Sequence, residues 1–343
     1  MDFSMLQSQL LLPKNSSLFK RLRYKLNRWN NKPDPAGIKT LKDLAPSLIH
    51  AHFGTSAVDI WPYAKALGIP MLVTLHGFDI SIRREWWEEG KRSRRKKKYP
   101  AQLDQLAREK SVHFLAVSSA IRDRAIAFGI PAEKITVSYI GVDTQQFSTG
   151  PTPVLERKNN IVYVGRLVEK KGSPYLIEAF SAVKAKVPDA QLIIVGKGEL
   201  EEKLKQSVQA LNLRDVIFAG AKTSQQVKEL IDQSKVFCLP SITANNGDAE
   251  GLPISILEAQ ASGVFVVTSS SGGLHDNLIP QETCFYFEEK NVTQLADQLI
   301  ELLSYPEKHT HILATQNLLI DEKFQLTKCA AQLEAIYDRF SLP

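Results

Sequence analysis

Glu250 and Glu258 stand eight positions apart in the stretch EGLPISILEAQASG, which follows the apolar run VFCLPS and a polar loop. Glu250, followed by Gly251 and Leu252, lies in that loop, where its carboxylate can face a ligand. Glu258 is about one to two turns into the predicted helix, so it reaches only a group alongside the helix. The pair predicts a site for a long ligand. As structural residues they would be a helix-start acid and a solvent-facing glutamate, but the apolar neighbours of Glu258 disfavour an exposed face.

A second loop carries two cations between two glycines. In GRLVEKKGS, Arg166 and Lys171 lie between Gly165 and Gly172, after the apolar run NIVYV and before a predicted helix. Glycine lets the backbone approach a ligand closely, and a helix N-terminus favours an anion. The loop therefore predicts a phosphate site, with simple surface charges as the alternative.

These loops can meet only if the strands before them share a sheet. Short β-branched runs alternate with longer stretches whose apolar residues recur at three- and four-residue spacing. Buried strands joined by helices form parallel α/β sheets, and the loops beyond their carboxyl ends form the ligand site. The predicted strands fall at 47–53, 71–77, 113–118, 135–141, 160–165, 190–196, 215–220, 235–241 and 264–270.

The length of the chain and a break in this alternation predict two domains. A chain of 343 residues with 43% apolar content can bury two hydrophobic cores. The periodicity stops in DTQQFSTGPTPVLERKN, where Gly, Pro, Ser and Thr collect. We expect a first domain over residues 1–150, a second over 151–322, and an amphipathic C-terminal helix over 323–343.

Composition argues against membrane-spanning and disulfide-rich proteins. No apolar run reaches the roughly 18 residues that a membrane span needs, and the N-terminal stretch lacks the order of a secretory signal. The three cysteines, Cys238, Cys284 and Cys329, are widely separated and have no metal-ligand spacing. We therefore expect a cytoplasmic protein whose cysteines only pack in the interior.

A basic run in the first hundred residues predicts an anionic partner. Seven of the eight residues in KRSRRKKK, 91–98, are basic, and the aromatic residues of REWW precede them. Such a mixture suits a membrane surface or a nucleic acid, although a solvated charge run is the simpler alternative. The residues expected to contact a membrane or an acceptor are Trp86, Trp87, Lys91, Arg92, Arg94 and Arg95, and Tyr99 is expected beside them.

The two motifs together resemble a known family. VGRLVEKKG, with EGLPISILEAQASG starting 84 residues after Arg166, is similar to the retaining nucleotide-sugar glycosyltransferases of GT-B fold, glycosyltransferase family 4. HAHFGT, VTLHGFD, LAVSS and YIGVD extend the likeness into the first half. The sequence around Glu250 most resembles the colanic acid and amylovoran exopolysaccharide branch of this family. The resemblance implies two Rossmann-like parallel-sheet domains facing a cleft, with the C-terminal helix returning to the first domain.

The resemblance also implies roles for single residues. The glutamate matching Glu250 faces the hydroxyls of the donor sugar, and the one matching Glu258 hydrogen-bonds the ribose. Those matching Arg166 and Lys171 hold the diphosphate, and His76 in TLHG matches a histidine near the reaction centre. Gly165, Gly251 and Leu252 belong to the same donor-binding motifs.

The implied reaction moves a sugar from a nucleotide-sugar to a lipid-linked or polysaccharide acceptor with retention of configuration. No Asp-x-Asp pair occurs in the chain, which agrees with a site that needs no metal or other cofactor. A lipid-linked acceptor would place the enzyme peripherally at the inner face of the membrane, on anionic lipid, and no nucleic-acid partner is expected.

The first domain departs from the family pattern. The first glycine is Gly37, and residues 1–45 show no strand-glycine-helix unit, so the N-terminal domain can be incomplete. Two alternatives share some of these features. A soluble glucan or disaccharide synthase, or a phosphorylase, of the same fold would use the phosphate site without the basic run, and a nucleic-acid-binding protein would use only the basic run.

Overall fold

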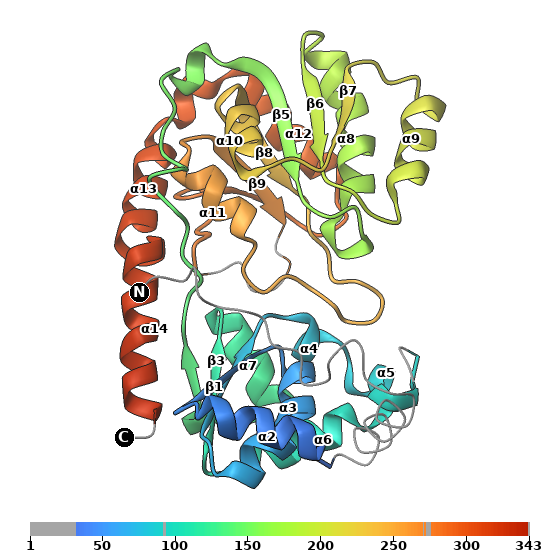
Figure 1. Cartoon of the computed structure of the whole chain (residues 1–343). Helices are drawn as coiled ribbons and strands as arrows, with labels where there is room; N and C mark the ends of the chain where they lie inside the picture. Colours follow the sequence, from blue (N-terminus) through green and yellow to red (C-terminus); the bar gives the residue numbers. More distant parts are fainter. Residues whose placement is uncertain (1–31, 92–93, 270, 272–275, 342–343) are drawn as a thin grey trace.

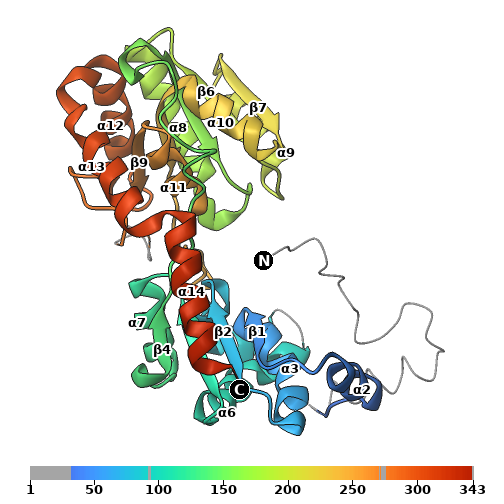
Figure 2. The same ribbon diagram turned by 60° about the vertical axis from the view of Figure 1, so that its left-hand side comes forward.

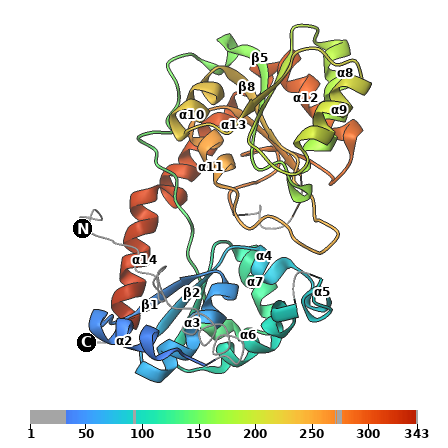
Figure 3. The same cartoon turned by 45° about the vertical axis from the view of Figure 1, so that its right-hand side comes forward.

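A computed structural model describes residues 32–91, 94–269, 271 and 276–341 as two α/β domains, one above the other in Figures 1 and 3. Each domain is a parallel sheet with helices packed on it, as the alternation of short apolar runs and amphipathic stretches predicts. None of the helices in these ranges is long and apolar enough to cross a bilayer.

The described part of the first domain has a four-stranded parallel sheet in the order β1-β2-β3-β4. Its strands are β1 (Ile49–His52), β2 (Met71–Leu75), β3 (Val112–Ala116) and β4 (Ile135–Val137). Its helices are α2 (Pro35–Leu44), α3 (Gly54–Leu67), α4 (Phe78–Ser81), α5 (Arg84–Glu88), α6 (Tyr99–Arg108) and α7 (Ser119–Phe128), with 3₁₀ turns η2 (Arg94–Lys98) and η3 (Ala132–Lys134). All five residues of β2 are buried, because β2 lies between two strands and under helices.

In the described part of the second domain, six parallel strands form a sheet in the order β10-β9-β8-β5-β6-β7. They are β5 (Lys158–Val164), β6 (Gln191–Val195), β7 (Val216–Gly220), β8 (Ser234–Leu239), β9 (Phe265–Ser269) and β10 (Phe285–Phe287). The helices are α8 (Ser173–Lys186), α9 (Glu201–Ala210), α10 (Ser224–Asp232), α11 (Ile254–Ala261), α12 (Val292–Ser304) and α13 (His311–Leu319), with short turns η4 (Val154–Glu156), η5 (Glu169–Lys171) and η6 (Pro306–His309).

The strand predictions are confirmed for β1 to β9, and β10 is the strand that they miss. β10 has only three residues and lies at the edge of its sheet, so it offers too short a pattern to detect. Helix boundaries follow local signals in several places. Thr223 and Gln226 form a capping box at the start of α10, and Gly68 ends α3 in the left-handed conformation that glycine favours.

The C-terminal helix belongs to the second half of the sequence but lies along the first domain (Figure 2). It follows a π-helical turn, η7 (Ile320–Phe324), and is labelled α14 (Leu326–Phe340). The Tyr337 hydroxyl is 2.6 Å from Nδ1 of His50 on β1, and the Phe340 ring stacks on His113 of β3 at 4.6 Å between centroids. The chain that leaves β4 pairs with the start of this helix, since Leu326 donates its backbone N–H to Val142.

Most of the stretch in which the sequence shows no strand-glycine-helix unit, residues 1–31, lies outside the described part of the chain. Residues 32–48 contain α2, whose N-cap Asp34 accepts a hydrogen bond from the backbone N–H of Ala36, and no strand. The first described strand is therefore β1.

Candidate active site

A cavity of about 740 Å³ opens between the two domains. Aromatic and basic side chains contribute the wall from the first domain, and a mixture of cations and carboxylates contributes the other. The first wall consists of Phe53, His76, Phe78, Trp86 and Lys91, and the second of Arg166, Val168, Glu169, Lys170, Glu199, Ala244, Asn246 and Asp248. Both walls lie at the carboxyl ends of parallel strands, where ligands of such sheets bind.

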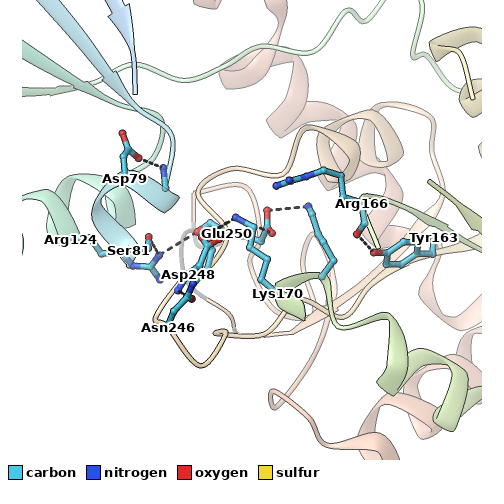
Figure 4. Close-up of polar contacts among 12 residues, drawn as sticks. Asp79, Ser81, Arg124, Tyr163, Arg166, Lys170, Asn246, Asp248 and Glu250 are labelled. Carbon is cyan, nitrogen blue, oxygen red and sulfur yellow. Dashed lines mark hydrogen bonds and ion pairs between the residues drawn. The ribbon is translucent and has the colours of Figure 1, made fainter. Parts of the chain in front are cut away.

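Glu250 is buried and paired with two lysines (Figure 4). The residue is 6% exposed, and one carboxylate oxygen accepts a hydrogen bond from Lys171 Nζ at 3.1 Å. The other oxygen lies 3.9 Å from Lys170 Nζ and has no hydrogen-bond partner among the described residues. A buried carboxylate keeps its charge only beside such cations, and its free lone pairs can accept hydroxyl groups of a ligand.

The loop of Arg166 is tightly folded and leaves the Arg166 side chain exposed. The Arg166 carbonyl accepts a hydrogen bond of 3.0 Å from the buried Tyr163 hydroxyl, while the Arg166 side chain is exposed and lines the cavity. A methyl group on Gly172 would lie 1.7 Å from the Pro240 carbonyl oxygen, so only glycine fits there. The loop holds the guanidinium toward the space between the domains, as Figure 4 shows.

Glu258 lies on α11 and is not among the residues that line the cavity. Burial raises the pKa of its carboxyl group, and no partner for that group is found among the residues that the structure describes. The side chain is half-buried, so the exposed-face alternative does not hold. Hydrogen bonds from hydroxyl donors stabilise an unpaired, partly desolvated carboxylate strongly, because it has lost water and has no other partner.

The segment around Glu250 also joins the two domains. The Gly251 carbonyl accepts a hydrogen bond of 2.9 Å from Ser118 Oγ, and the Glu250 carbonyl lies 3.5 Å from Arg124 Nη1. A methyl group on Gly251 would be 2.3 Å from the His76 carbonyl oxygen. Leu252 is buried directly after this contact. Gly251 is therefore a point of close contact between the domains.

His76 stands at the meeting point of the two walls. Its Nε2 is 3.0 Å from Nδ1 of His52, and its ring centroid is 4.5 Å from that of Phe53. Burial, helped by the charge of His52, lowers the pKa of His76 to about 4. His76 is therefore a neutral imidazole at neutral pH, which can donate or accept a hydrogen bond without adding charge. Within the described ranges, no group of three His, Cys, Asp or Glu side chains is placed so that it could hold a metal ion.

Asp79 is a buried carboxylate that sequence reasoning missed. It is fully buried and accepts hydrogen bonds from the backbone N–H groups of Gly54, at 2.8 Å, and Gly77, at 3.0 Å. Burial raises its pKa to about 6 against the effect of these hydrogen bonds. The residue thereby ties the loop after β1 to the loop that carries His76. Its position at the start of a short helix after TLHG was the available signal.

The structure corrects part of the prediction about the basic run and the aromatic residues beside it. Trp87 and Tyr99 are each 1% exposed and their rings lie 4.8 Å apart in the core, so the prediction that they contact a membrane or an acceptor is wrong. Trp86 and Lys91 line the cavity, with Lys91 Nζ 4.6 Å from the Trp86 ring centroid. Arg92 and the side chains of Arg94 and Arg95 lie outside the described part of the chain.

Other site residues had no usable sequence signal. Lys170 contacts Asp248 at 3.0 Å as well as approaching Glu250, yet in the sequence it is indistinguishable from Lys171. Arg124 donates to Ser81 Oγ at 2.7 Å, and so connects α7 to the last residue of α4. These contacts join residues more than forty positions apart, which spacing alone cannot reveal.

Two family models match the chain in succession. The model described as Glycosyltransferase Family 4 matches residues 12–146, and the one described as Glycosyl transferases group 1 matches residues 146–315. With two facing parallel-sheet domains and the cation-carboxylate loops at their cleft, this chain belongs to the glycosyltransferases of GT-B fold that these models describe.

Individual relatives agree with this membership. The amylovoran biosynthesis glycosyltransferase AmsK of Erwinia amylovora is 29% identical over 320 residues, which are 89% of this chain and 76% of AmsK. The putative colanic acid biosynthesis glycosyltransferase WcaL of Escherichia coli K12 is 32% identical over 253 residues, which are 73% of this chain and 59% of WcaL. The structure of Anabaena HepE in complex with UDP-glucose shares the fold at a TM-score of 0.75 and 20% identity, covering 89% of this chain and 82% of HepE.

Proposed function

We propose that this chain transfers a sugar from a nucleotide-sugar donor to a lipid-linked or polysaccharide acceptor in the biosynthesis of an exopolysaccharide or another cell-surface glycan. One observation carries the proposal: buried Glu250 is paired with Lys171, directly behind the wall that Arg166, Lys170 and Asp248 contribute to the cavity between two Rossmann-like domains. The names of AmsK and WcaL refer to amylovoran and colanic acid biosynthesis, which supports the class of product.

The proposed chemistry depends on where charge develops. The leaving nucleoside diphosphate gains negative charge as the glycosidic bond breaks, and cations already fixed in place lower the barrier. Arg166 and Lys171 would serve as these cations. Glu250 has a free carboxylate oxygen for the hydroxyls of the donor sugar, and neutral His76 can hydrogen-bond the same sugar. We propose that the acceptor attacks from the face that the phosphate leaves, which retains the anomeric configuration.

Nucleotide binding tests the proposal directly. UDP or GDP should raise the melting temperature of the wild type, because a ligand that binds only the folded state stabilises it. Glu258→Ala should lower the affinity for that nucleotide roughly tenfold or more, which is the usual contribution of hydrogen bonds to a charged acceptor. Affinity should also fall as the pH is lowered through the raised pKa of Glu258, because the ionised carboxylate accepts from the ribose hydroxyls.

Glu178→Ala provides the matched control, since Glu178 is exposed on α8 outside the cavity. It should leave both the affinity and its pH dependence unchanged. Equal nucleotide affinity in the wild type and Glu258→Ala would remove the ribose assignment. The absence of any response to UDP and to GDP would contradict the proposed function itself.

Metal dependence and stereochemistry form a second test. We expect transfer to survive excess EDTA, because Arg166 and Lys171 supply the charge that a divalent ion supplies elsewhere. NMR of the first-formed glycoside should show the anomeric configuration of the donor. An inverted product, or activity abolished by EDTA and restored by a divalent ion, would contradict the proposed mechanism.

Membrane attachment is expected from a lipid-linked acceptor and the basic run 91–98. We propose a cytoplasmic protein held peripherally at the inner face of the membrane, where each basic residue near anionic lipid contributes about 1 kcal/mol. The protein should sediment with vesicles that contain anionic lipid at low salt and be released at high salt. Replacing the basic residues of 91–98 by glutamine should abolish sedimentation and preserve nucleotide binding. Equal sedimentation with neutral vesicles, or tighter binding to duplex DNA, would contradict this role.

A further inference from the structure

The first-domain wall of the cavity is built of aromatic rings. Phe53, Phe78 and Trp86 all line it, and the Phe53 and Phe78 ring centroids are 5.1 Å apart. Rings that border a cavity of this size offer flat apolar faces to a ligand, and a few polar groups then fix its orientation. A pyranose ring presents the matching flat face of C–H groups with hydroxyls around its edge.

Phe53 is held in this wall by a strained backbone. Its φ of 71° and ψ of 135° lie where residues with a side chain seldom occur. Two neighbouring contacts enforce the geometry: the Phe53 N–H donates to the Thr74 carbonyl at 2.8 Å, and the next N–H, of Gly54, donates to buried Asp79 at 2.8 Å. Such strain persists where the surroundings determine it, and it concentrates at ligand sites. The phenylalanine ring is therefore kept against His76 although glycine would fit the backbone better.

Lys91 supplies the charge of this wall. Of the five residues that form the first-domain wall, Lys91 and His76 are basic. Because the pKa of His76 is lowered to about 4, Lys91 is the one of the five that is cationic at neutral pH. Lys91 Nζ lies 4.6 Å from the Trp86 ring centroid and 2.5 Å from Glu89, and the side chains of Lys91 and Glu89 are both about half exposed. An exposed pair of this kind is weak, so an anionic ligand on Trp86 can compete for the ammonium group.

We propose that the acceptor sugar, which lies against this wall when the donor occupies the facing one, carries a negative charge, as a carboxylate or a phosphate. The proposal rests on the proposed function, because Arg166 on the facing wall is then occupied with the donor, while Lys170 is paired with Asp248. The sugar ring stacks on Trp86, its anionic group pairs with Lys91, and its reacting hydroxyl points toward His76 and Glu250.

Ligand-observed NMR on the full chain, with saturating UDP or GDP, tests the subsite. Three probes share a glucose-type ring and a methyl aglycone and differ only at C6: methyl β-D-glucuronide carries a carboxylate, methyl β-D-glucoside 6-phosphate a phosphate, and methyl β-D-glucoside no charge. We expect at least one anionic probe to bind roughly fivefold or more tightly than the glucoside, the upper end for an exposed charge pair. The tighter of the two anions identifies the group. No binding of any probe, or tighter binding of the glucoside, overturns the proposal.

Variants separate stacking from charge. Trp86→Ala should lower the affinity for every probe that binds about tenfold, and Trp86→Phe should restore most of that affinity. Lys91→Gln should weaken only the anionic probes, about fivefold, whereas Lys98→Gln, an exposed lysine outside the cavity, should change none. A preference for anions that survives Lys91→Gln, or a Trp86→Ala variant that loses nucleotide and keeps the probes, overturns the proposal. Failure of the proposed function is distinct, because the wild type would then bind no nucleotide.

Discussion

Replacing Arg166 by alanine is expected to lower kcat for glycosyl transfer by a factor of about 10²–10³, the usual loss when one fixed group that stabilises developing charge is removed. Nucleoside diphosphate affinity should fall much less, because the charge is greatest in the transition state. The melting temperature should stay almost unchanged, since the side chain is exposed. Steady-state kinetics, calorimetric titration with the nucleotide and a thermal melt measure these three quantities.

Arg166 is a cleaner test than Lys171. Removing Lys171 would leave the buried Glu250 carboxylate with Lys170 alone at 3.9 Å, so stability and catalysis would change together. Arg214→Ala is the matched control, because Arg214 is exposed in the same domain and does not line the cavity. A loss in nucleotide affinity as large as the loss in kcat would show that Arg166 only binds the donor.

Gly251→Ala should cost at least about 10²-fold in kcat/KM, although no reactive group is removed. The new methyl group would lie 2.3 Å from the His76 carbonyl oxygen and 3.1 Å from the carbonyl carbon, so the two domains must separate at this point. A displacement of about 1 Å at reacting groups is enough for a loss of this size. Kinetics measures the loss, and small-angle X-ray scattering measures the change in domain spacing.

Gly68→Ala separates this effect from the general penalty of replacing a glycine. Gly68 has a φ of 68° at the end of α3, and no atom within 4 Å of an added methyl group. Its replacement should cost about 1 kcal/mol of stability and leave kcat/KM unchanged. If Gly251→Ala kept wild-type kinetics, the contact between Gly251 and His76 would not determine the active geometry.

The second-domain fold could be predicted because its strands are long and apolar. Runs such as NIVYV and QLIIV become central strands buried by helices on both faces, and such strands leave a continuous apolar pattern. β10 could not be found in this way, since its three residues owe their conformation to pairing with β9. The return of α14 to the first domain was implied by the family resemblance, and its amphipathic pattern alone does not state which domain it covers.

The candidate site was predictable where one loop carries its own signal and was missed where partners come from distant segments. Arg166 and Glu250 stand between or beside glycines that mark their loops. Lys170 and Asp248 become neighbours only when the loops after β5 and β8 meet. The error on Trp87 has a similar origin, since charges beside an aromatic residue describe a surface equally well whether its ring faces solvent or the core.

The position of α14 bears on how the protein is made. The last described strand of the first-domain sheet ends at Val137, yet the helix that contacts β1 and β3 ends at Phe340, 203 residues later. At a usual rate of synthesis, about 10–40 s pass before that helix leaves the ribosome. During this interval the nascent first domain exposes the side of its sheet that carries His50 and His113. Until α14 is made, a chaperone or the folding second domain must cover this side if aggregation is to be prevented.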